Sequence, residues 1–330
     1  MMEMKYRLWA CLLFLPMVLW ASGRPKVAVV LSGGGAKGTA HIGALKVIEE
    51  AGIPIDYVVG TSMGAIVGGL YSIGYTPQQL DSMVNAQNWK FLLSDAPNPK
   101  DVLLDDRLKS ERYVLSIPFS LKSAAVSDAG IIKGKNLARL FSTLTEGYQD
   151  SVDFSRLPIP FACVSENLVN GSEVVFHEGI LATAMRSSMS IPGVFAPVDL
   201  DGMVLVDGGM VNNYPVDVAL AMGADYIIGV DVQSPLLKAS ELKSVKDIFG
   251  QIINLQGEKK YRENLRNTDV LIKVDVTGYS AASFTKEAID TLMVRGERAA
   301  MDSWDGLLAL KRKLGLAEAV SYTHLTLPTT

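Results

Sequence analysis

The first part of the chain alternates short apolar runs with amphipathic stretches. Residues 27–31 (VAVVL) are continuously apolar, which is typical of a buried strand in a parallel sheet. Apolar residues then recur at helical spacing over 39–50, until Gly52-Ile53-Pro54 stops the pattern. A second apolar run over 55–59 is followed by a small-residue helical stretch over 65–73. This order of strand, helix, strand and helix predicts a βαβ unit and therefore a parallel sheet.

The rest of the chain predicts further strands and helices, without an internal repeat or a dividing linker. We expect strands over 112–120, 159–164, 173–176, 203–206, 226–232 and 270–274. We expect helices over 77–85, 134–145, 180–187, 216–222 and 307–320, with others after 244 and after 285. Residues 88–106 mix Pro, Asp and Leu, and predict a loop or short helices. The pattern predicts one α/β domain over residues 24–320.

Both ends of the chain depart from this pattern. Two basic residues precede an apolar stretch over 8–20, and small residues follow it, which is typical of a secretory signal peptide cleaved before Arg24. The stretch is shorter than the roughly 20 residues that span a bilayer. We therefore expect residues 1–23 to be a signal peptide and the protein to be exported to the periplasm, the outer membrane or the medium. Residues 321–330 are Thr-rich and unpatterned, and we expect an unstructured or non-native tail.

Charge and cysteine content exclude several classes of function. The net charge is −4 and no long basic run is present, so the chain lacks the electrostatic signature of a nucleic-acid-binding protein. Cys11 lies in the predicted signal peptide, which leaves Cys163 alone in an apolar run, where a buried thiol is expected. Neither C-x-x-C nor H-E-x-x-H occurs, so we expect no metal site.

The segment Gly60-Thr61-Ser62-Met63-Gly64 lies between a predicted strand and a predicted helix. In that setting a G-x-S-x-G serine is held on a tight turn with its hydroxyl exposed at the end of the strand, above a helix N-terminus. The turn requires glycine at positions 60 and 64, because a side chain at either position would clash. Ser62 is therefore a candidate nucleophile.

A second glycine cluster, Gly33-Gly34-Gly35-Ala36-Lys37-Gly38, joins the first predicted strand to the first helix. It satisfies the dinucleotide pattern G-x-G-x-x-G, and Asp56 lies near the distance expected for a ribose-binding acid. It fails as a phosphate loop, because no Gly-Lys-Ser/Thr follows at the required spacing. It also fits an oxyanion hole, in which backbone N–H groups polarise the carbonyl that a serine attacks. The neighbouring serine motif favours the oxyanion hole.

The serine needs a base, and the histidines supply none in an expected place. His41 precedes Ser62, His177 follows a short strand and is predicted to be partly exposed, and His324 lies in the tail. An aspartate offers an alternative, because Asp207 follows a predicted strand and precedes Gly208 and Gly209. From this segment alone Asp207 fits either an Asx-turn or helix cap, or a base within hydrogen-bond reach of Ser62.

In chain order, these motifs are the Gly33–Gly38 cluster, the Gly60–Gly64 segment and Asp207-Gly208-Gly209. Together they resemble the signature blocks of the patatin-like phospholipase family, here of an exported bacterial member. Residues 185–195 (MRSSMSIPGVF) also resemble the family's segment ahead of the aspartate, and the similarity covers residues 26–232. The resemblance implies a three-layer α/β/α fold with a mainly parallel central sheet, and a dyad of Ser62 as nucleophile and Asp207 as base. One departure is residues 164–168 (VSENL), where many relatives carry a Thr-Asp pair.

The resemblance also implies acyl-ester hydrolysis of a lipid or phospholipid without a cofactor, and hence transient contact with a membrane surface. The oxyanion hole is then expected in the Gly34–Gly35 region. Lys37 and Arg186 are the basic residues nearest the motifs, and each is either a phosphate or head-group contact or an ordinary ion pair. Apolar runs over 89–93 and 114–119 are candidates for an exposed rim, with core packing as the alternative. A dinucleotide enzyme and a catalytically silent lipid-binding module remain competing functions.

Overall fold

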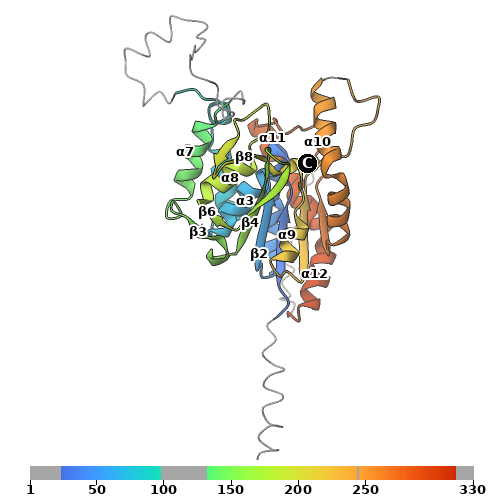
Figure 1. Cartoon of the computed structure of the whole chain (residues 1–330). Helices are drawn as coiled ribbons and strands as arrows, with labels where there is room; N and C mark the ends of the chain where they lie inside the picture. The colour runs from blue at the N-terminus through green and yellow to red at the C-terminus, as the bar shows by residue number, and fades with distance from the viewer. Residues whose placement is uncertain (1–23, 98–131, 244, 317–330) are drawn as a thin grey trace, which may run out of the picture.

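The computed structural model describes residues 24–97, 132–243 and 245–316 (Figure 1). The predicted signal peptide 1–23, the predicted strand over 112–120 and the tail over 321–330 lie outside this part of the chain. The predicted helix over 307–320 begins earlier, at Trp304, and ends at Lys313, before the described residues end at 316.

The centre of the fold is one sheet with the strand order β10-β9-β1-β2-β4-β8-β7, and β5 pairs with β4 away from this path. The strands are β1 (Val27–Leu31), β2 (Tyr57–Thr61), β4 (Phe161–Asn167), β5 (Ser172–Phe176), β7 (Val198–Leu200), β8 (Met203–Asp207), β9 (Tyr226–Asp231) and β10 (Val270–Lys273). β10, β9, β1, β2 and β4 pair in parallel, whereas β5 and β8 run antiparallel to β4, and β7 antiparallel to β8. The prediction of a mainly parallel sheet is therefore confirmed.

Helices cover both faces of this sheet. Those in the described residues are α2 (Ala40–Glu50), α3 (Met63–Ser72), α4 (Pro77–Asn85), α5 (Trp89–Leu92), α7 (Lys135–Leu144), α8 (Leu181–Ser188), α9 (Val216–Ala221), α10 (Val245–Arg266), α11 (Lys286–Asp302) and α12 (Trp304–Lys313). Short 3-10 helices are η1 (Gly35–Thr39), η3 (Phe154–Arg156) and η4 (Gly208–Met210), and β3 (Val152–Asp153) pairs with β6 (Glu178–Gly179) in a separate ribbon.

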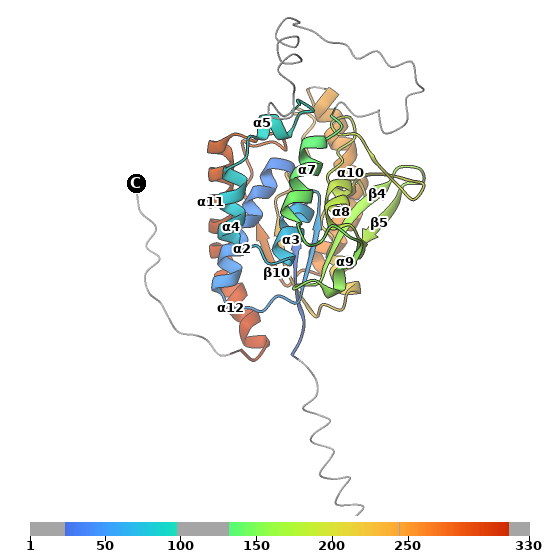
Figure 2. The ribbon, with the colours of Figure 1, turned by 90° about the vertical axis from the view of Figure 1, so that its left-hand side faces the viewer.

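Two apolar cores result from the alternation of side chains along the buried strands. In β1, Val27, Val29 and Leu31 face the larger core, which α2, α3, α4, α7, α8 and α11 complete; Figure 2 shows this layer across the front of the molecule. Ala28 and Val30 face the opposite way, into a smaller core with α9 and the C-terminal part of α10. The three-layer α/β/α fold expected from the sequence is thus present.

Most predicted elements lie close to their expected bounds. The apolar run over 27–31 is β1, and the helix over 77–85 is α4, which begins at the Thr76-Pro77 cap with Thr76 Oγ1 accepting from the Gln79 N–H. The sequence pattern missed β3, β6 and β7, which have two or three residues each, too few to show a period. Within the described residues, no helix is both long enough and apolar enough to cross a membrane.

Candidate active site

Ser62 lies on a strained turn between β2 and α3. Its backbone has φ +56° and ψ −121°, a region that residues other than glycine rarely occupy and that costs on the order of 1–3 kcal/mol. The turn needs two glycines because the backbone approaches itself closely. A Cβ at Gly60 would lie 2.3 Å from the Gly64 carbonyl oxygen, and one at Gly64 would lie 2.2 Å from the Leu31 carbonyl oxygen. The tight turn predicted between a strand and a helix is present.

The register of an antiparallel strand brings Asp207 to this turn. Thr61 of β2 pairs with Val164 of β4, and the next residue of β4, Ser165, pairs with Asp207 at the end of β8. Asp207 therefore ends β8 at the level of Ser62, although β8 runs against β4. The Ser62 hydroxyl donates to Asp207 Oδ2 over 2.6 Å, which places the aspartate within the reach that a base requires.

The surroundings of Asp207 raise the pKa of its carboxyl to about 6. Burial is the main cause, because it disfavours the charged form; Asp207 is 6% exposed and Ser62 is 5% exposed. Hydrogen bonds from the Ser62 hydroxyl and from the Gly209 N–H, 2.7 Å from Oδ1, act in the opposite direction. Gly208 packs against β4, where a Cβ would lie 2.2 Å from the Val164 carbonyl oxygen. A carboxylate with this pKa can accept a proton near neutral pH.

The glycine loop lines the same cleft as Ser62 and Asp207. The N–H groups of Gly33 and Ala36 donate to the carbonyls of Asn213 and Ala281, and that of Lys37 donates to Gly34. The Gly34 and Gly35 N–H groups have no acceptor among the residues that the structure describes. Gly35 has φ +57°, which suits glycine. Gly38 packs on α3, where a Cβ would lie 2.4 Å from Met63 Cγ. Two adjacent N–H groups are therefore left to stabilise an anion.

Ser188, which no sequence motif predicted as a site residue, holds the turn in place. Its hydroxyl accepts from the Ser62 N–H over 2.9 Å and donates to the Val164 carbonyl over 2.5 Å. It thereby connects the candidate nucleophile to β4 from the end of α8. The run of serines before Asp207 was the available signal, but only the fold shows which serine meets Ser62.

A comparison with protein-family models shows which family has these motifs. The family model described as patatin-like phospholipase matches residues 29–220, which is more than half of the chain. The chain belongs to the patatin-like phospholipase family. The matched region contains the glycine loop, the Ser62 turn and Asp207, which are the motifs on which the resemblance was based.

Several curated relatives share this family domain. An uncharacterised NTE family protein of Mycobacterium bovis is 32% identical over 211 residues, which cover 64% of this chain and 50% of the relative. Patatin-like phospholipase domain-containing protein 6 of Homo sapiens is 32% identical over 210 residues, covering 63% of this chain and 13% of that protein. The chain thus spans half or less of the length of these relatives.

Solved structures of low sequence identity also align with this chain. VipD from Legionella pneumophila has 17% identity and a TM-score of 0.44, with 86% of this chain and 67% of that chain covered. Human GIVD cytosolic phospholipase A2 has 14% identity and a TM-score of 0.44, with 88% and 59% covered.

Neither His41 nor His177 lies where it could act as a base for Ser62. His41 Nε2 lies 2.7 Å from the Ser32 carbonyl oxygen, inside the fold, and burial lowers the pKa of its imidazole to about 4. His177 is exposed and lines a separate surface pocket beside β5. Asp56, the acid expected for a dinucleotide ribose, pairs with Arg24 and accepts from the Val27 N–H at the N-terminal ends of β1 and β2, whereas the glycine loop follows the C-terminal end of β1. That geometry contradicts a dinucleotide site at the glycine loop.

The two candidate head-group residues differ in position. Lys37 lines the cleft and its ammonium donates to Ser234 Oγ over 3.0 Å; burial, with the nearby charge of Lys273, lowers its pKa to about 8. Arg186 is buried, and its guanidinium donates to Ser190 Oγ and to the Lys133 and Ala196 carbonyls. Arg186 therefore supports the loop before Asp207 and does not face the cleft.

We expect Arg186→Ala to lower activity equally on neutral and phosphorylated lipids. The substitution leaves buried carbonyls unpaired and removes the packing of Arg186 on Phe195, so it should destabilise the fold by about 2–4 kcal/mol. The measurement compares kcat/KM on diacylglycerol and on phosphatidylglycerol, with chemical unfolding of the same protein. A loss confined to the phosphorylated lipid would restore the head-group hypothesis for Arg186.

Two cavities meet at Ser62 and differ in polarity. One is an open cleft of about 250 Å³ that contains Asp207, the glycine loop, Lys37 and polar side chains of the segment after β9. The other is apolar, has a volume of about 430 Å³, and is lined mainly by side chains of Met, Ile, Leu, Val, Pro and Phe. A molecule with a polar end and a hydrocarbon end therefore fits across Ser62. Such a shape suits an acyl ester.

Proposed function

We propose that this protein is a serine hydrolase that cleaves fatty-acyl esters of lipids through Ser62 and Asp207. The observation that carries the proposal is the 2.6 Å hydrogen bond from the strained Ser62 to a buried Asp207, at the junction of a polar cleft and an apolar cavity. Membership of the patatin-like phospholipase family supports the same chemistry. The predicted signal peptide supports an exported enzyme that meets its lipid at a membrane surface.

The proposed reaction begins when Asp207 takes the Ser62 hydroxyl proton as the oxygen attacks the ester carbonyl. The negative charge that develops on the carbonyl oxygen is stabilised by the Gly34 and Gly35 N–H groups, and each such donor contributes roughly 3–4 kcal/mol in serine hydrolases. Asp207 then gives the proton to the leaving alcohol, and an acyl-enzyme remains on Ser62. A water molecule then loses a proton to Asp207 and attacks the acyl carbon, and the fatty acid leaves as Asp207 returns that proton to Ser62 Oγ.

A fluorophosphonate probe tests this proposal directly, because it reacts with an activated serine and leaves other serines unmodified. We expect a single adduct, on the peptide that contains Ser62. The labelling rate should fall as the pH decreases through about 6, because the protonated Asp207 cannot accept the Ser62 proton. Ser82→Ala, an exposed position on α4, serves as the control and should label like the parent.

The probe also separates the competing functions. If the protein were a catalytically silent lipid-binding module or a dinucleotide enzyme, the probe would not react with Ser62 at any pH. Absence of an adduct between pH 5 and 9, in protein that is shown to be folded, would therefore reject the hydrolase proposal.

A further inference from the structure

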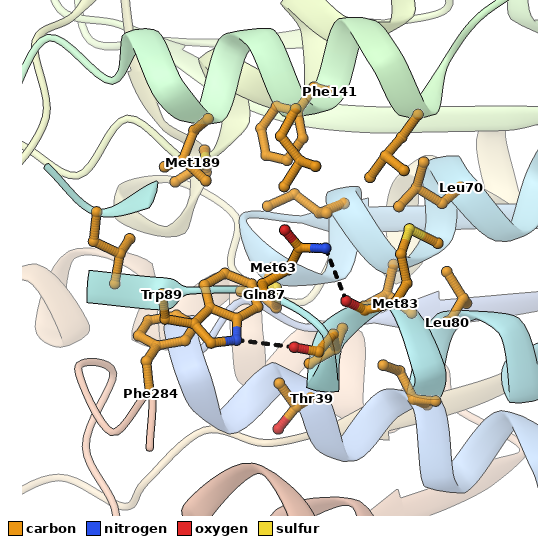
Figure 3. Close-up of a pocket in the computed structure, with 18 residues that line it drawn as sticks. Thr39, Met63, Leu70, Leu80, Met83, Gln87, Trp89, Phe141, Met189 and Phe284 are labelled. Carbon is orange, nitrogen blue, oxygen red and sulfur yellow. Dashed lines mark hydrogen bonds between the residues drawn. The ribbon is translucent and has the colours of Figure 1, made fainter. Parts of the chain in front are cut away.

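A narrow apolar chamber lies in the larger core, next to the apolar cavity at Ser62, and Figure 3 shows the side chains that line it. It lies between α3, α4 and α7, and each helix contributes four residues at the spacing i, i+3, i+4 and i+7, which places them on one helical face. The residues are Met63, Ile66, Val67 and Leu70 from α3; Leu80, Met83, Val84 and, just past its end, Gln87 from α4; and Leu137, Leu140, Phe141 and Leu144 from α7.

The chamber adjoins the apolar cavity that reaches Ser62. The two cavities share the side chains of Met63, Ile66, Leu93, Met189 and Phe284. The chamber then follows α3 from its first turn to Leu70, which is eight residues beyond Ser62. At the helical rise of 1.5 Å per residue, its far end lies roughly 12 Å along the helix from Ser62.

The few polar groups around the chamber are already bonded. The indole N–H of Trp89 donates to the Val84 carbonyl over 3.0 Å, and the Gln87 side-chain amide donates to the Met83 carbonyl over 3.0 Å (Figure 3). The Thr39 hydroxyl donates to the Ala36 carbonyl over 2.8 Å. Because these donors have partners, a hydrocarbon can occupy the chamber without leaving them unsatisfied.

The walls nearest Ser62 can adapt to an occupant. The chamber itself has a volume of only about 50 Å³, so a long chain needs side-chain movement to enter. Met63 and Met189 stand at the junction of the two cavities, and a third methionine, Met83, lies deeper. Methionine has flexible, unbranched side chains that rearrange at low cost. The stacked rings of Trp89 and Phe284, 4.7 Å apart, form a further wall near this junction.

We propose that the chamber between α3, α4 and α7 holds the distal part of the substrate's acyl chain, so that the enzyme prefers long-chain acyl esters over short ones. This inference rests on the proposed hydrolase function. A short acyl group fills only the cavity beside Ser62, whereas a long one also buries methylene groups in the chamber. Each additional buried methylene strengthens binding of the long chain alone.

Two substitutions of opposite size at half-buried chamber positions test the inference. Val84→Phe fills the chamber, and we expect it to lower the ratio of kcat/KM for p-nitrophenyl hexadecanoate to that for p-nitrophenyl butyrate by about tenfold or more. Leu140→Ala enlarges the chamber, and the preferred chain length should move upward along a series of esters in one nonionic detergent. Val174→Phe on β5 is the matched control; it lines neither cavity and should keep the parent ratio.

The outcomes separate this inference from the proposed function. If the parent cleaves butyrate and neither Val84→Phe nor Leu140→Ala changes the chain-length ratio relative to Val174→Phe, the chamber does not hold the chain, while the hydrolase proposal stands. If the parent cleaves no ester of any length, the hydrolase proposal fails and the inference fails with it. If Val84→Phe does not fold, the shift or constancy of the Leu140→Ala profile decides.

Discussion

Ser62→Ala is expected to lower kcat/KM for p-nitrophenyl butyrate by at least about 10⁴-fold, because it removes the only atom of Ser62 that can attack the ester. The protein should still fold, since alanine fits the space of serine and the Ser62 N–H can still donate to Ser188. Circular dichroism and thermal unfolding of the variant check that the fold is retained. Residual turnover within tenfold of the parent would contradict the dyad.

The same experiment can show that Ser62 and Asp207 act as a unit. If Asp207 serves only to activate Ser62, the double variant Ser62→Ala/Asp207→Asn should lose no more activity than Ser62→Ala alone, because residues of one catalytic unit are not additive. Ser82→Ala is again a suitable control, because its exposed hydroxyl bonds only within α4. A further large loss in the double variant would indicate that Asp207 has a separate role.

The sequence predicted the local parts of the candidate site better than the strand pairing that brings them together. The apolar runs and glycine clusters specify β1, the glycine loop, β2 and the turn at Ser62, because these contacts are local in the chain. Asp207 was expected beside Ser62 from the family resemblance, because its own segment fitted either a helix cap or a base. In the structure β8 is antiparallel to β4, and the register of this pairing brings Asp207 to the level of Ser62. Strand direction is not encoded in an apolar run of five residues.

Tertiary contacts also decided which nearby polar residues take part. Arg186 and Ser188 lie two residues apart on α8, yet Arg186 points to the Lys133 and Ala196 carbonyls and Ser188 points to the Ser62 turn. The helical period turns their side chains about 200° apart, so proximity in sequence gave no guide to proximity at the site. In the same way, the apolar run at 89–93 fitted either an exposed rim or core packing, and only the fold shows that Trp89 and Leu93 pack against the core and line the chamber.

The site is assembled at a cost to stability, and that cost has a definite dependence on pH. The backbone of Ser62 is strained. Burial favours the neutral form of the Asp207 carboxyl and raises its pKa above that of an aspartate in water. Its pKa is about 6 in the folded protein, against 3.8 for an unperturbed aspartate. A raised folded-state pKa means that the group contributes most to stability below pH 4, and that this contribution is lost as the pH rises through 6.

Asp207→Asn should therefore be inactive and yet more stable than the parent at neutral pH. The asparagine is uncharged, can still accept from the Gly209 N–H, and can donate to the Ser62 hydroxyl. At about 1.4 kcal/mol per pKa unit, the gain in free energy of unfolding above pH 7 is on the order of 2–3 kcal/mol. Urea unfolding of both proteins at pH 8 and pH 4 measures it.

The gain should fall to about 0.5 kcal/mol at pH 4, because Asp207 is then protonated in the folded parent, whereas an unfolded aspartate with a pKa of 3.8 is only about half protonated. Asp199→Asn on β7 provides the matched control: its carboxyl is exposed, so the free energy of unfolding should change by no more than about 0.5 kcal/mol at either pH. Two results would contradict this expectation: Asp207→Asn is less stable than the parent at pH 8, or its gain in free energy of unfolding is the same at pH 4 as at pH 8. Either would show that burial of the Asp207 carboxylate does not destabilise the folded protein. In that case burial would not raise the pKa of Asp207, and the argument that Asp207 accepts the Ser62 proton near neutral pH would fail.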